Sequence, residues 1–311
     1  MNWIFLAAVA QFLNAIVAIV DKRIVSDEKI LPKPFVYGFY TCLISGAWVG
    51  VYFLGFLPFS FGGIHFPSFD NVLRPTLEVV ALAYLAAYTF FIALVSMFST
   101  LREADASDVI PVIGATSAIA SFGLGHFFLG TAMTSHYGIG IAILAFGTFL
   151  VSHFHFTLKT ALVALHSGLF FAFHYIAIKG LFMVTSFDDG FFWSRMAFVF
   201  FALSLLMIPN YFNKIKEQTQ ATSRQAGYLI LANKVLAGVS TILILKATDL
   251  GDVAVVQALG GLQYIFILLF GIILTFMPSP VPFGERYHKE AILQKTLFVA
   301  VITIGFLVLF R

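Results

Sequence analysis

Ten apolar segments dominate this sequence. A bilayer core about 30 Å thick needs roughly 20 apolar residues per helix. Segments of that kind, separated by charges, prolines or polar clusters, lie at residues 2–20, 35–57, 77–99, 105–128, 137–155, 159–181, 190–210, 226–247, 251–277 and 292–310. Charged residues make up only 11% of the chain, whereas soluble domains carry about 25%. We therefore predict an all-α polytopic membrane protein, and a soluble enzyme is excluded.

The connections between these segments are short, the longest being residues 58–76 and 211–225. Neither is long enough to fold as a separate domain, so side chains inside the helix bundle must carry the function. No basic residue precedes the first segment, which therefore predicts a retained span rather than a cleaved signal peptide. We expect an integral protein of the cell (inner) membrane.

The two halves of the chain share three features in the same order. Each half has a lysine that closes its first segment, an Asp-x-x-Asp motif before its fourth and a glycine turn before its last. These are Lys22, Asp105–Asp108 and Leu129-Gly130 in the first half, and Lys179, Asp249–Asp252 and Phe283-Gly284 in the second. The pattern predicts ten transmembrane helices in two five-helix repeats, residues 1–157 and 158–311. Because five is odd, the second repeat is expected to be inverted.

These features resemble the drug/metabolite transporter superfamily in its EamA-domain branch. Other residues that carry the resemblance are Pro111, Gly114, Gly138 and Gly147 in the first half, and Gly284-Glu285 and Gly305 in the second. The chain departs from the family pattern at Thr131, where an acidic residue is usual, and segment 251–277 has no proline that matches Pro111. The resemblance implies export or exchange of small metabolites, amino acids among them, without ATP hydrolysis. No Gly-x-x-x-x-Gly-Lys-Ser/Thr loop is present, which agrees with that implication.

Lys234 is the strongest single candidate for a functional residue. It lies eight residues into segment 226–247, roughly 12 Å deep at 1.5 Å per residue. A lysine this deep in a membrane is costly. Its ammonium is predicted to face a central cavity, where it would attract a carboxylate or phosphate or release a proton. The alternative is that the side chain snorkels to the interface.

Other polar side chains within the segments share helix faces. Gln11 and Asn14 lie on one face with Asp21, His166 and His174 on another, and Tyr84 with Tyr88 and Gln257 with Tyr264 form further pairs. Interhelical hydrogen bonding, satisfied histidines and aromatic packing are the alternatives to substrate contact. The predicted substrate-binding residues are Gln11, Asn14, Tyr84, Tyr88, His166, His174, Lys234, Gln257 and Tyr264.

We expect a secondary transporter, not an enzyme, that moves a small metabolite such as an amino acid by alternating access, as an exporter or exchanger. Titratable His and Lys residues leave proton or ion coupling open. One alternative is an intramembrane enzyme that acts on a lipid-like substrate with histidines as acid/base groups. Another is a lipid-moving accessory subunit of the same fold.

Several partners are not expected. No cofactor or metal is predicted, because the chain has one cysteine and no His-Glu-x-x-His motif. Basic residues are scattered rather than clustered, which argues against nucleic acid. Gly46-Ala-Trp-Val-Gly50 matches a helix-dimerisation motif and leaves a homodimer open.

The orientation of the chain in the membrane is left open. Twelve basic residues follow the odd-numbered segments and five lie on the other side, which places both termini outside by the positive-inside rule. The family resemblance implies termini inside.

Overall fold

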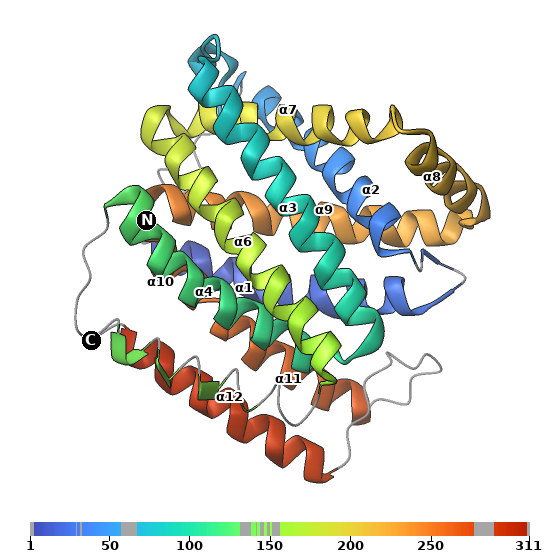
Figure 1. Cartoon of the computed structure of the whole chain (residues 1–311), viewed down its shortest axis with the longest axis vertical. Helices are drawn as coiled ribbons and strands as arrows, with labels where there is room; N and C mark the ends of the chain where they lie inside the picture. The colour runs from blue at the N-terminus through green and yellow to red at the C-terminus, as the bar shows by residue number, and fades with distance from the viewer. Residues whose placement is uncertain are drawn as a thin grey trace.

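A computed structural model describes residues 3–28, 30–31, 33–56, 67–130, 138–140, 142–143, 146–147, 150, 156–276 and 289–309. The helices in these ranges are α1 (Trp3–Ser26), α2 (Pro34–Gly46), α3 (Leu77–Glu103), α4 (Ala106–Leu129), α6 (Leu158–Val184), α7 (Phe187–Leu206), α8 (Pro209–Ala221), α9 (Arg224–Leu250), α10 (Val253–Ala258), α11 (Gly261–Phe276) and α12 (Lys289–Leu309) (Figure 1). Two 3₁₀ helices, η1 (Ala47–Phe56) and η2 (Phe69–Asn71), follow α2.

Within the described ranges, eight helices are long and apolar enough to cross a membrane. They correspond to all the predicted segments except the fifth and the tenth. The tenth coincides with α12, whose apolar part, Leu293–Gly305, is shorter. The fifth, 137–155, falls largely outside the described residues. The prediction of an all-α integral membrane protein is therefore confirmed, while the count of ten spans stays a prediction.

The helices begin where polar residues can satisfy their free backbone N–H groups. The side-chain oxygens of Thr76, Thr157, Ser186 and Ser223 each accept a hydrogen bond from the backbone N–H three residues later. Pro34 and Pro209 occupy the first turns of α2 and α8, where a missing N–H is harmless. These polar residues interrupt the apolar pattern, so the predicted segment starts lie within a few residues of the observed helix starts.

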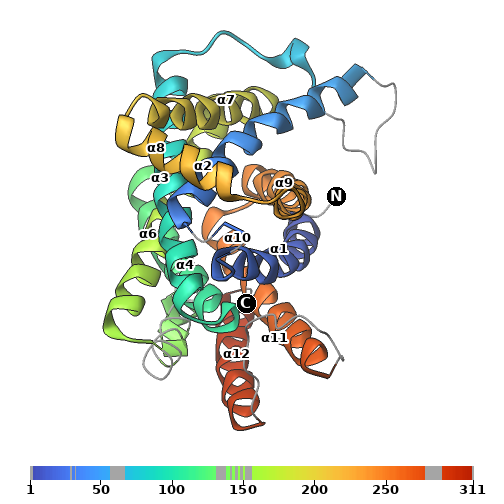
Figure 2. The same cartoon turned by 90° about the vertical axis from the view of Figure 1, so that its right-hand side faces the viewer.

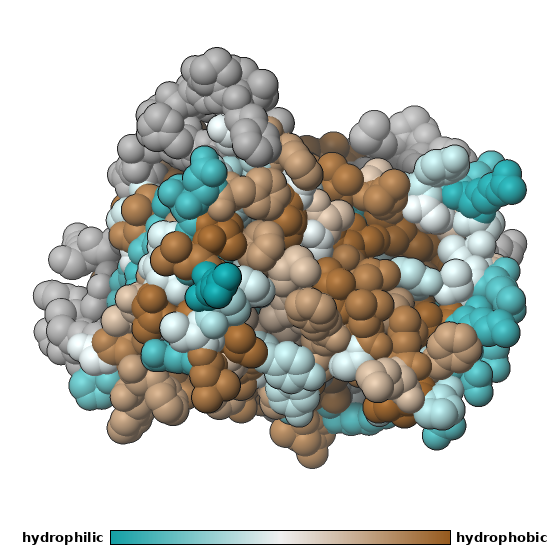
Figure 3. Space-filling model, turned by 90° about the horizontal axis from the view of Figure 1, so that it is seen from above, coloured by the Kyte–Doolittle hydropathy of each residue, from teal (hydrophilic) through white to brown (hydrophobic). Residues whose placement is uncertain are grey.

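The connection predicted at residues 211–225 is mostly helical rather than irregular. Helix α8 fills it, and of its residues only Ile215 and Gln218 are buried. The hydroxyl of Thr222 donates to the carbonyl oxygen of Ile30 at 3.2 Å, which ties the end of α8 to the loop between α1 and α2. Hydrophilic residues gather at the right-hand edge of Figure 3, the side on which α8 lies in Figure 1, while hydrophobic residues cover much of the face between the edges.

The long helices form two closely packed pairs. Helix α3 packs along α6, and α1 packs along α9. Figure 2 shows the first pair on one side of the molecule and the second pair on the other, with α10 between them. Helix α4 extends the first group through its contact with α6, and α11 extends the second through its contact with α1. The bundle thus has two lateral groups, which meet where α1 contacts α3 and α11 contacts α4.

Two lysines join the ends of these helices. The Lys22 ammonium at the end of α1 donates to the carbonyl oxygens of Leu101 and Ala104 at 2.6 and 2.8 Å. The Lys179 ammonium near the end of α6 donates to the carbonyl oxygens of Thr248, Asp249 and Gly251 at 2.9, 2.8 and 3.1 Å. Each lysine therefore caps the C-terminus of another helix, α3 or α9, where a positive charge is favourable.

Helix α12 is anchored by a third lysine. The Lys295 ammonium lies 3.3 Å from the carboxylates of both Asp105 and Asp108 at the start of α4, and it donates to the hydroxyl of Ser107 at 2.7 Å. The first Asp-x-x-Asp motif thus holds α12 against α4.

We predict that Lys179→Met destabilises the protein, because three carbonyl groups at the end of α9 lose a charged donor. The expected loss is about 2 kcal/mol, the scale of a hydrogen bond to a charged group. It would be measured as a lower melting temperature in detergent. Lys216→Met on the exposed face of α8 is the matched control, and an equal change in both variants would contradict the capping role.

Candidate functional site: the central cavity

A cavity of about 190 Å³ lies between the two groups of helices. Helices from residues 1–157 and from residues 158–311 both contribute to its walls. Its polar lining residues are Gln11, Asn14, Asp21, Thr41, Ser45, Ser117, Tyr175, Arg195, Lys234, Thr241, Gln257, Gln263 and Tyr264. Five of the nine predicted substrate-binding residues, namely Gln11, Asn14, Lys234, Gln257 and Tyr264, therefore lie at this cavity.

Lys234 forms a buried ion pair at the cavity wall. Its ammonium lies 3.1 Å from Oδ1 of Asp21, and both side chains are only 4% exposed. The same Oδ1 accepts hydrogen bonds from Asn233 Nδ2, at 2.7 Å, and from the hydroxyl of Tyr37. The lysine therefore does not snorkel to the interface. Its first partner is a carboxylate of α1, and the pair joins α1 to α9.

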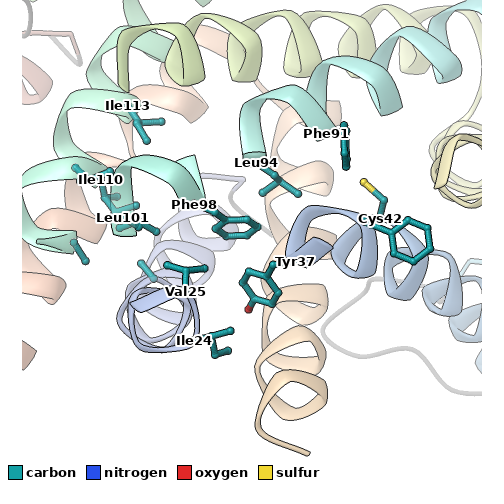
Figure 4. Packing of buried hydrophobic residues seen from close by; sticks show 14 of the residues in the cluster. Ile24, Val25, Tyr37, Cys42, Phe91, Leu94, Phe98, Leu101, Ile110 and Ile113 are labelled. Carbon is teal, nitrogen blue, oxygen red and sulfur yellow. The ribbon is translucent and has the colours of Figure 1, made fainter. Parts of the chain in front are cut away.

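Aromatic rings surround this ion pair. The Lys234 ammonium lies 4.1 Å from the ring centroid of Tyr37 and 5.2 Å from that of Phe98. Figure 4 shows Tyr37 beside Phe98, with Ile24 and Val25 of α1 close by. These neighbours bury the pair, so the charges of Lys234 and Asp21 depend largely on each other for neutralisation.

Asn14 links α1 to two other helices. Its Oδ1 accepts from the hydroxyl of Ser240 in α9 at 2.6 Å, and its backbone carbonyl oxygen accepts from Gln263 Nε2 of α11 at 3.1 Å. Its own Nδ2 donates to Gln11 Oε1 at 3.4 Å. These residues combine the two roles that the sequence left open, because they line the cavity and also carry interhelical hydrogen bonds.

Tyr264 lies against a glycine on the facing helix. A Cβ atom at Gly114 of α4 would come within 1.7 Å of the Tyr264 hydroxyl, so only glycine leaves room for the ring. The hydroxyl oxygen of Tyr264 is buried and has no hydrogen-bond partner. It is therefore available to a solute in the cavity.

The ninth predicted segment is interrupted beside the cavity. Helix α10 ends at Ala258 and α11 begins at Gly261. Across the junction, the backbone N–H groups of Gly260 and Gln263 donate to the carbonyl oxygens of Gln257 and Gly260, three residues earlier, at 3.0 and 2.9 Å. A Cβ at Gly260 would lie 2.8 Å from the Gln257 carbonyl oxygen. The glycine thus permits a tight turn that places Gln257 and Tyr264 on the same cavity.

Arg195 is a cavity residue that the sequence reasoning missed. Its side chain lies in α7, is 2% exposed and lines the cavity. The guanidinium carbon lies 5.2 and 4.5 Å from the ring centroids of Phe191 and Phe198, and Nη2 is buried without a hydrogen-bond partner. Among the described residues, no carboxylate forms an ion pair with Arg195.

The nearest acids along α7 are engaged elsewhere. Asp188 Oδ2 accepts from Asn71 Nδ2 at 2.7 Å, and Asp189 Oδ1 accepts from the backbone N–H of Leu73 at 3.1 Å. A cation–π contact contributes about 0.5–2 kcal/mol, whereas burying an unpaired charge costs several kcal/mol. The two rings therefore compensate the Arg195 charge only in part.

A sequence signal for Arg195 did exist. The predicted segment begins at residue 190, only five residues before Arg195. Helix α7 starts at Phe187, so Arg195 lies about 12 Å along the helix at 1.5 Å per residue. An ionisable residue at that depth is a functional candidate by default. The predicted boundary lies three residues inside the observed one and therefore understates the depth of Arg195.

Four predicted substrate-binding residues do not line the cavity. Tyr84 and Tyr88 are each 45% exposed on the outer face of α3, where both contact Phe201. His166 is exposed and bonds through Nδ1 to the hydroxyl of Ser96 at 2.9 Å. The cause is helix periodicity, because their positions on α3 and α6 point away from the central space.

His174 is buried, and its contacts join two helices. Its Nδ1 donates to the carbonyl oxygen of Ala86 at 2.8 Å, and its ring lies 4.8 Å from that of Phe90. It therefore joins α6 to α3 outside the cavity lining.

Breaking the buried ion pair is predicted to destabilise the protein, and removing both charges is predicted to restore it. Asp21→Asn and Lys234→Met each leave one buried charge without its partner, at an expected cost of about 3 kcal/mol, whereas the double variant leaves none. Melting temperatures of the two single variants and the double variant measure this cycle. Additive losses would show that the pair does not act as a unit.

Gly114→Ala is predicted to lower the melting temperature, because the new methyl group collides with the Tyr264 hydroxyl. Gly123→Ala on the same helix is the matched control, since a Cβ there meets nothing within 4 Å. Alanine favours helix over glycine by up to about 1 kcal/mol, so the control variant should be neutral or slightly stabilised. A similar gain in both variants would contradict the close contact between α4 and α11.

Comparisons with known proteins agree with this architecture. One solved crystal structure is similar to this chain, with 14% sequence identity and a TM-score of 0.61. The alignment covers 97% of this chain and 96% of the other chain, which shows a shared fold. Among curated proteins, no significant match was found. The model of the EamA-like transporter family matches residues 1–153. The resemblance to the EamA branch of the drug/metabolite transporter superfamily is thereby confirmed for residues 1–153, the part of the chain that this family model covers.

Proposed function

We propose that this protein is a secondary transporter that moves a small solute through the central cavity by alternating access, as an exporter or exchanger in the cell's inner membrane. The observation that carries the proposal is a polar cavity in the middle of an apolar bundle, lined from both halves of the chain. The match of residues 1–153 to the EamA-like transporter family supports it. An amino acid or a related metabolite remains the expected kind of solute.

We also propose that residues 1–157 and 158–311 are inverted repeats. In that arrangement α1 corresponds to α6 and α3 to α9, so the pairing of α3 with α6 is the counterpart of the pairing of α9 with α1. The lysine caps support this correspondence. Lys22 bonds to the carbonyl oxygens of Leu101 and Ala104, and Lys179 bonds to those of Thr248 and Gly251. Thr248 lies 147 residues after Leu101, and Gly251 lies 147 residues after Ala104.

The same offset revises the alignment of the Asp-x-x-Asp motifs. Asp105 is the N-cap residue of α4, which follows α3, and Asp252 is the N-cap residue of α10, which follows α9. Both α3 and α9 are capped by a lysine. Asp249 lies near the end of α9 instead and pairs with Lys246 at 2.8 Å. The repeats therefore align Asp105 with Asp252, three residues away from the sequence-based pairing with Asp249.

The helix contacts suggest which parts move. Helices α3, α4 and α6 form one group, and α1, α9 and α11 form the other. The Asp21–Lys234 pair and the hydrogen bonds of Asn14 stay within the second group, because they join α1 to α9 and α11. Lys22 and Lys179 join the two groups only at helix ends. We infer that the two groups rock against each other across the cavity, with α4 and α10 in contact at the centre.

The histidine positions favour transport over the alternative of an intramembrane enzyme. Acid/base chemistry by histidine would need imidazole groups at the cavity. His166 is exposed and His174 bonds to a backbone carbonyl group, and the described cavity lining contains no histidine. Proton or ion coupling through Lys234 and Asp21 remains part of the proposal.

Cysteine accessibility in proteoliposomes tests alternating access without knowledge of the solute. Cys42 is buried and would be replaced by serine, after which Ser45→Cys or Ser117→Cys places a single thiol at the cavity. A charged maleimide should label either thiol from both sides of the membrane, since each state opens the cavity to one side. Tyr88→Cys, on the outer face of α3, is the matched control and should stay unlabelled.

Two outcomes would contradict the proposed mechanism. Labelling of both cavity thiols from only one side would show that the cavity does not alternate. Labelling from both sides with a steady ion conductance across the same liposomes would indicate an open pore.

A further inference from the structure

We propose that the transported solute carries a carboxylate or phosphate group, and that Arg195 binds this group inside the cavity. The inference rests on the proposed function and assigns the chemical class of its substrate. It is carried by three observations: the unsatisfied guanidinium of Arg195, the net charge of the cavity lining and the free hydroxyl of Tyr264.

The Arg195 side chain is held in place, but its Nη2 lacks an acceptor. Phe191 and Phe198 lie one turn away on either side and flank the guanidinium. The only hydrogen bond described for it runs from Nε to the hydroxyl of Ser194, at 3.5 Å, while Nη2 is buried and unpartnered. A planar guanidinium fixed in this way is suited to bind two oxygen atoms of one carboxylate or phosphate.

Other buried basic residues of the chain show what a structural role looks like. Lys22 and the half-buried Lys179 each donate to backbone carbonyl oxygens at helix ends, and Lys234 pairs with Asp21. Arg195 has no such partner among the described residues. Its environment is therefore that of a binding group whose partner comes from outside the chain.

The charges at the cavity favour a ligand with negative charge. The described lining contains two basic residues, Arg195 and Lys234, and one acid, Asp21, so the sum is two minus one, or +1. Lys234 and Asp21 neutralise each other at 3.1 Å, which leaves the charge of Arg195. Because charges inside a membrane protein are costly unless paired, a monoanion would neutralise the lining.

The rest of the cavity suits the polar part of a small solute. Tyr264 presents a buried hydroxyl without a hydrogen-bond partner, and Gln11, Asn14 and Gln257 add amide groups. Apolar lining residues such as Leu94 and Ile113 limit how many further charges the solute can carry. The solute is therefore expected to have one anionic group and one or more neutral hydrogen-bonding groups.

The test compares solutes that differ in charge. Melting temperatures of the purified full-length protein in lipid-free detergent would be measured with lactate against lactamide and with glycerol 3-phosphate against glycerol. A ligand that binds the folded form raises the melting temperature. We expect a rise with at least one of the two anions and none with its neutral counterpart.

Variants at position 195 assign the effect to the guanidinium. Arg195→Met should weaken binding of the effective anion by about tenfold to a hundredfold, the range expected for a lost charged hydrogen bond, and Arg195→Lys should weaken it less. The ligand-free Arg195→Met protein should melt at a higher temperature than the wild type, because an uncompensated buried charge is gone. Arg74→Met, at an exposed position, is the control and should keep the anion response.

Three results would overturn the inference. An anion response that survives Arg195→Met would place the binding group elsewhere, and the absence of any anion response in the wild type would exclude this substrate class. A lower melting temperature of ligand-free Arg195→Met without an anion response would assign Arg195 a structural role. In each case two-sided thiol labelling at the cavity would still support a transporter, so failure here is distinct from failure of the proposed function.

A separate arm identifies the source of the anionic group. The protein is placed in nanodiscs of phosphatidylcholine alone or with phosphatidylglycerol. If the ligand is a free solute, the anionic lipid should not raise the melting temperature in a way that depends on Arg195. The opposite result would be a melting temperature that rises with the anionic lipid, but not with lactate or glycerol 3-phosphate, and that no longer rises in Arg195→Met. It would overturn the assignment to a transported solute and indicate a lipid headgroup instead.

Discussion

The lack of water inside the membrane is the constraint on which this structure depends, because every charge there needs a partner that the protein supplies. Lys22 and Lys179 find theirs in backbone carbonyl oxygens at the ends of α3 and α9, and Lys295 finds carboxylates at the start of α4. Each of these bonds joins two helices, so charge neutralisation and helix packing are achieved by the same contacts. Among the described buried basic side chains, Arg195 at the central cavity is the one without such a partner.

Small residues decide where the space in the bundle lies. A Cβ at Gly238 of α9 would meet the ring of Trp48 at 1.8 Å, and one at Gly168 of α6 would lie 2.6 Å from the carbonyl oxygen of Ile113 in α4. Close approach at these positions lets large side chains pack at the edges of the cavity instead of filling it. Gly46 acts in the same way within the chain, because a Cβ there would meet Val199 of α7, which accounts for one glycine of the Gly-x-x-x-Gly match without a dimer.

Much of the fold could be predicted from the sequence, and the reasons are physical. Apolar length identifies a membrane helix wherever polar caps such as Thr76 and Ser223 end the apolar pattern. Helix α8 was not predicted, because its residues are mostly polar and only Ile215 and Gln218 are buried, so it has no apolar segment that could be recognised. The interruption at Gly260 was only hinted at by two adjacent glycines.

The candidate site was predicted less completely. Depth along a segment correctly drew attention to Lys234, but its pairing with Asp21 depends on the packing of α1 against α9, which no local pattern reveals. Face periodicity grouped Tyr84 with Tyr88 but could not say whether their face is turned to the cavity or to the lipid. Both kinds of error arise because sequence periodicity gives a face and never the partner of that face.

The site is asymmetric although the proposed framework is symmetric. In the repeat alignment given by the lysine caps, Lys22 corresponds to Lys179, whereas Asp21 corresponds to Ile178 and Lys234 to Ala87. Symmetric caps would keep the two helix groups equivalent, so that both open states have similar energy, as alternating access requires. A small solute has no such symmetry. Its charged and neutral ends would need different partners, so residues that bind it would have to break the symmetry, and the Asp21–Lys234 pair is a place at the cavity where the chain does so.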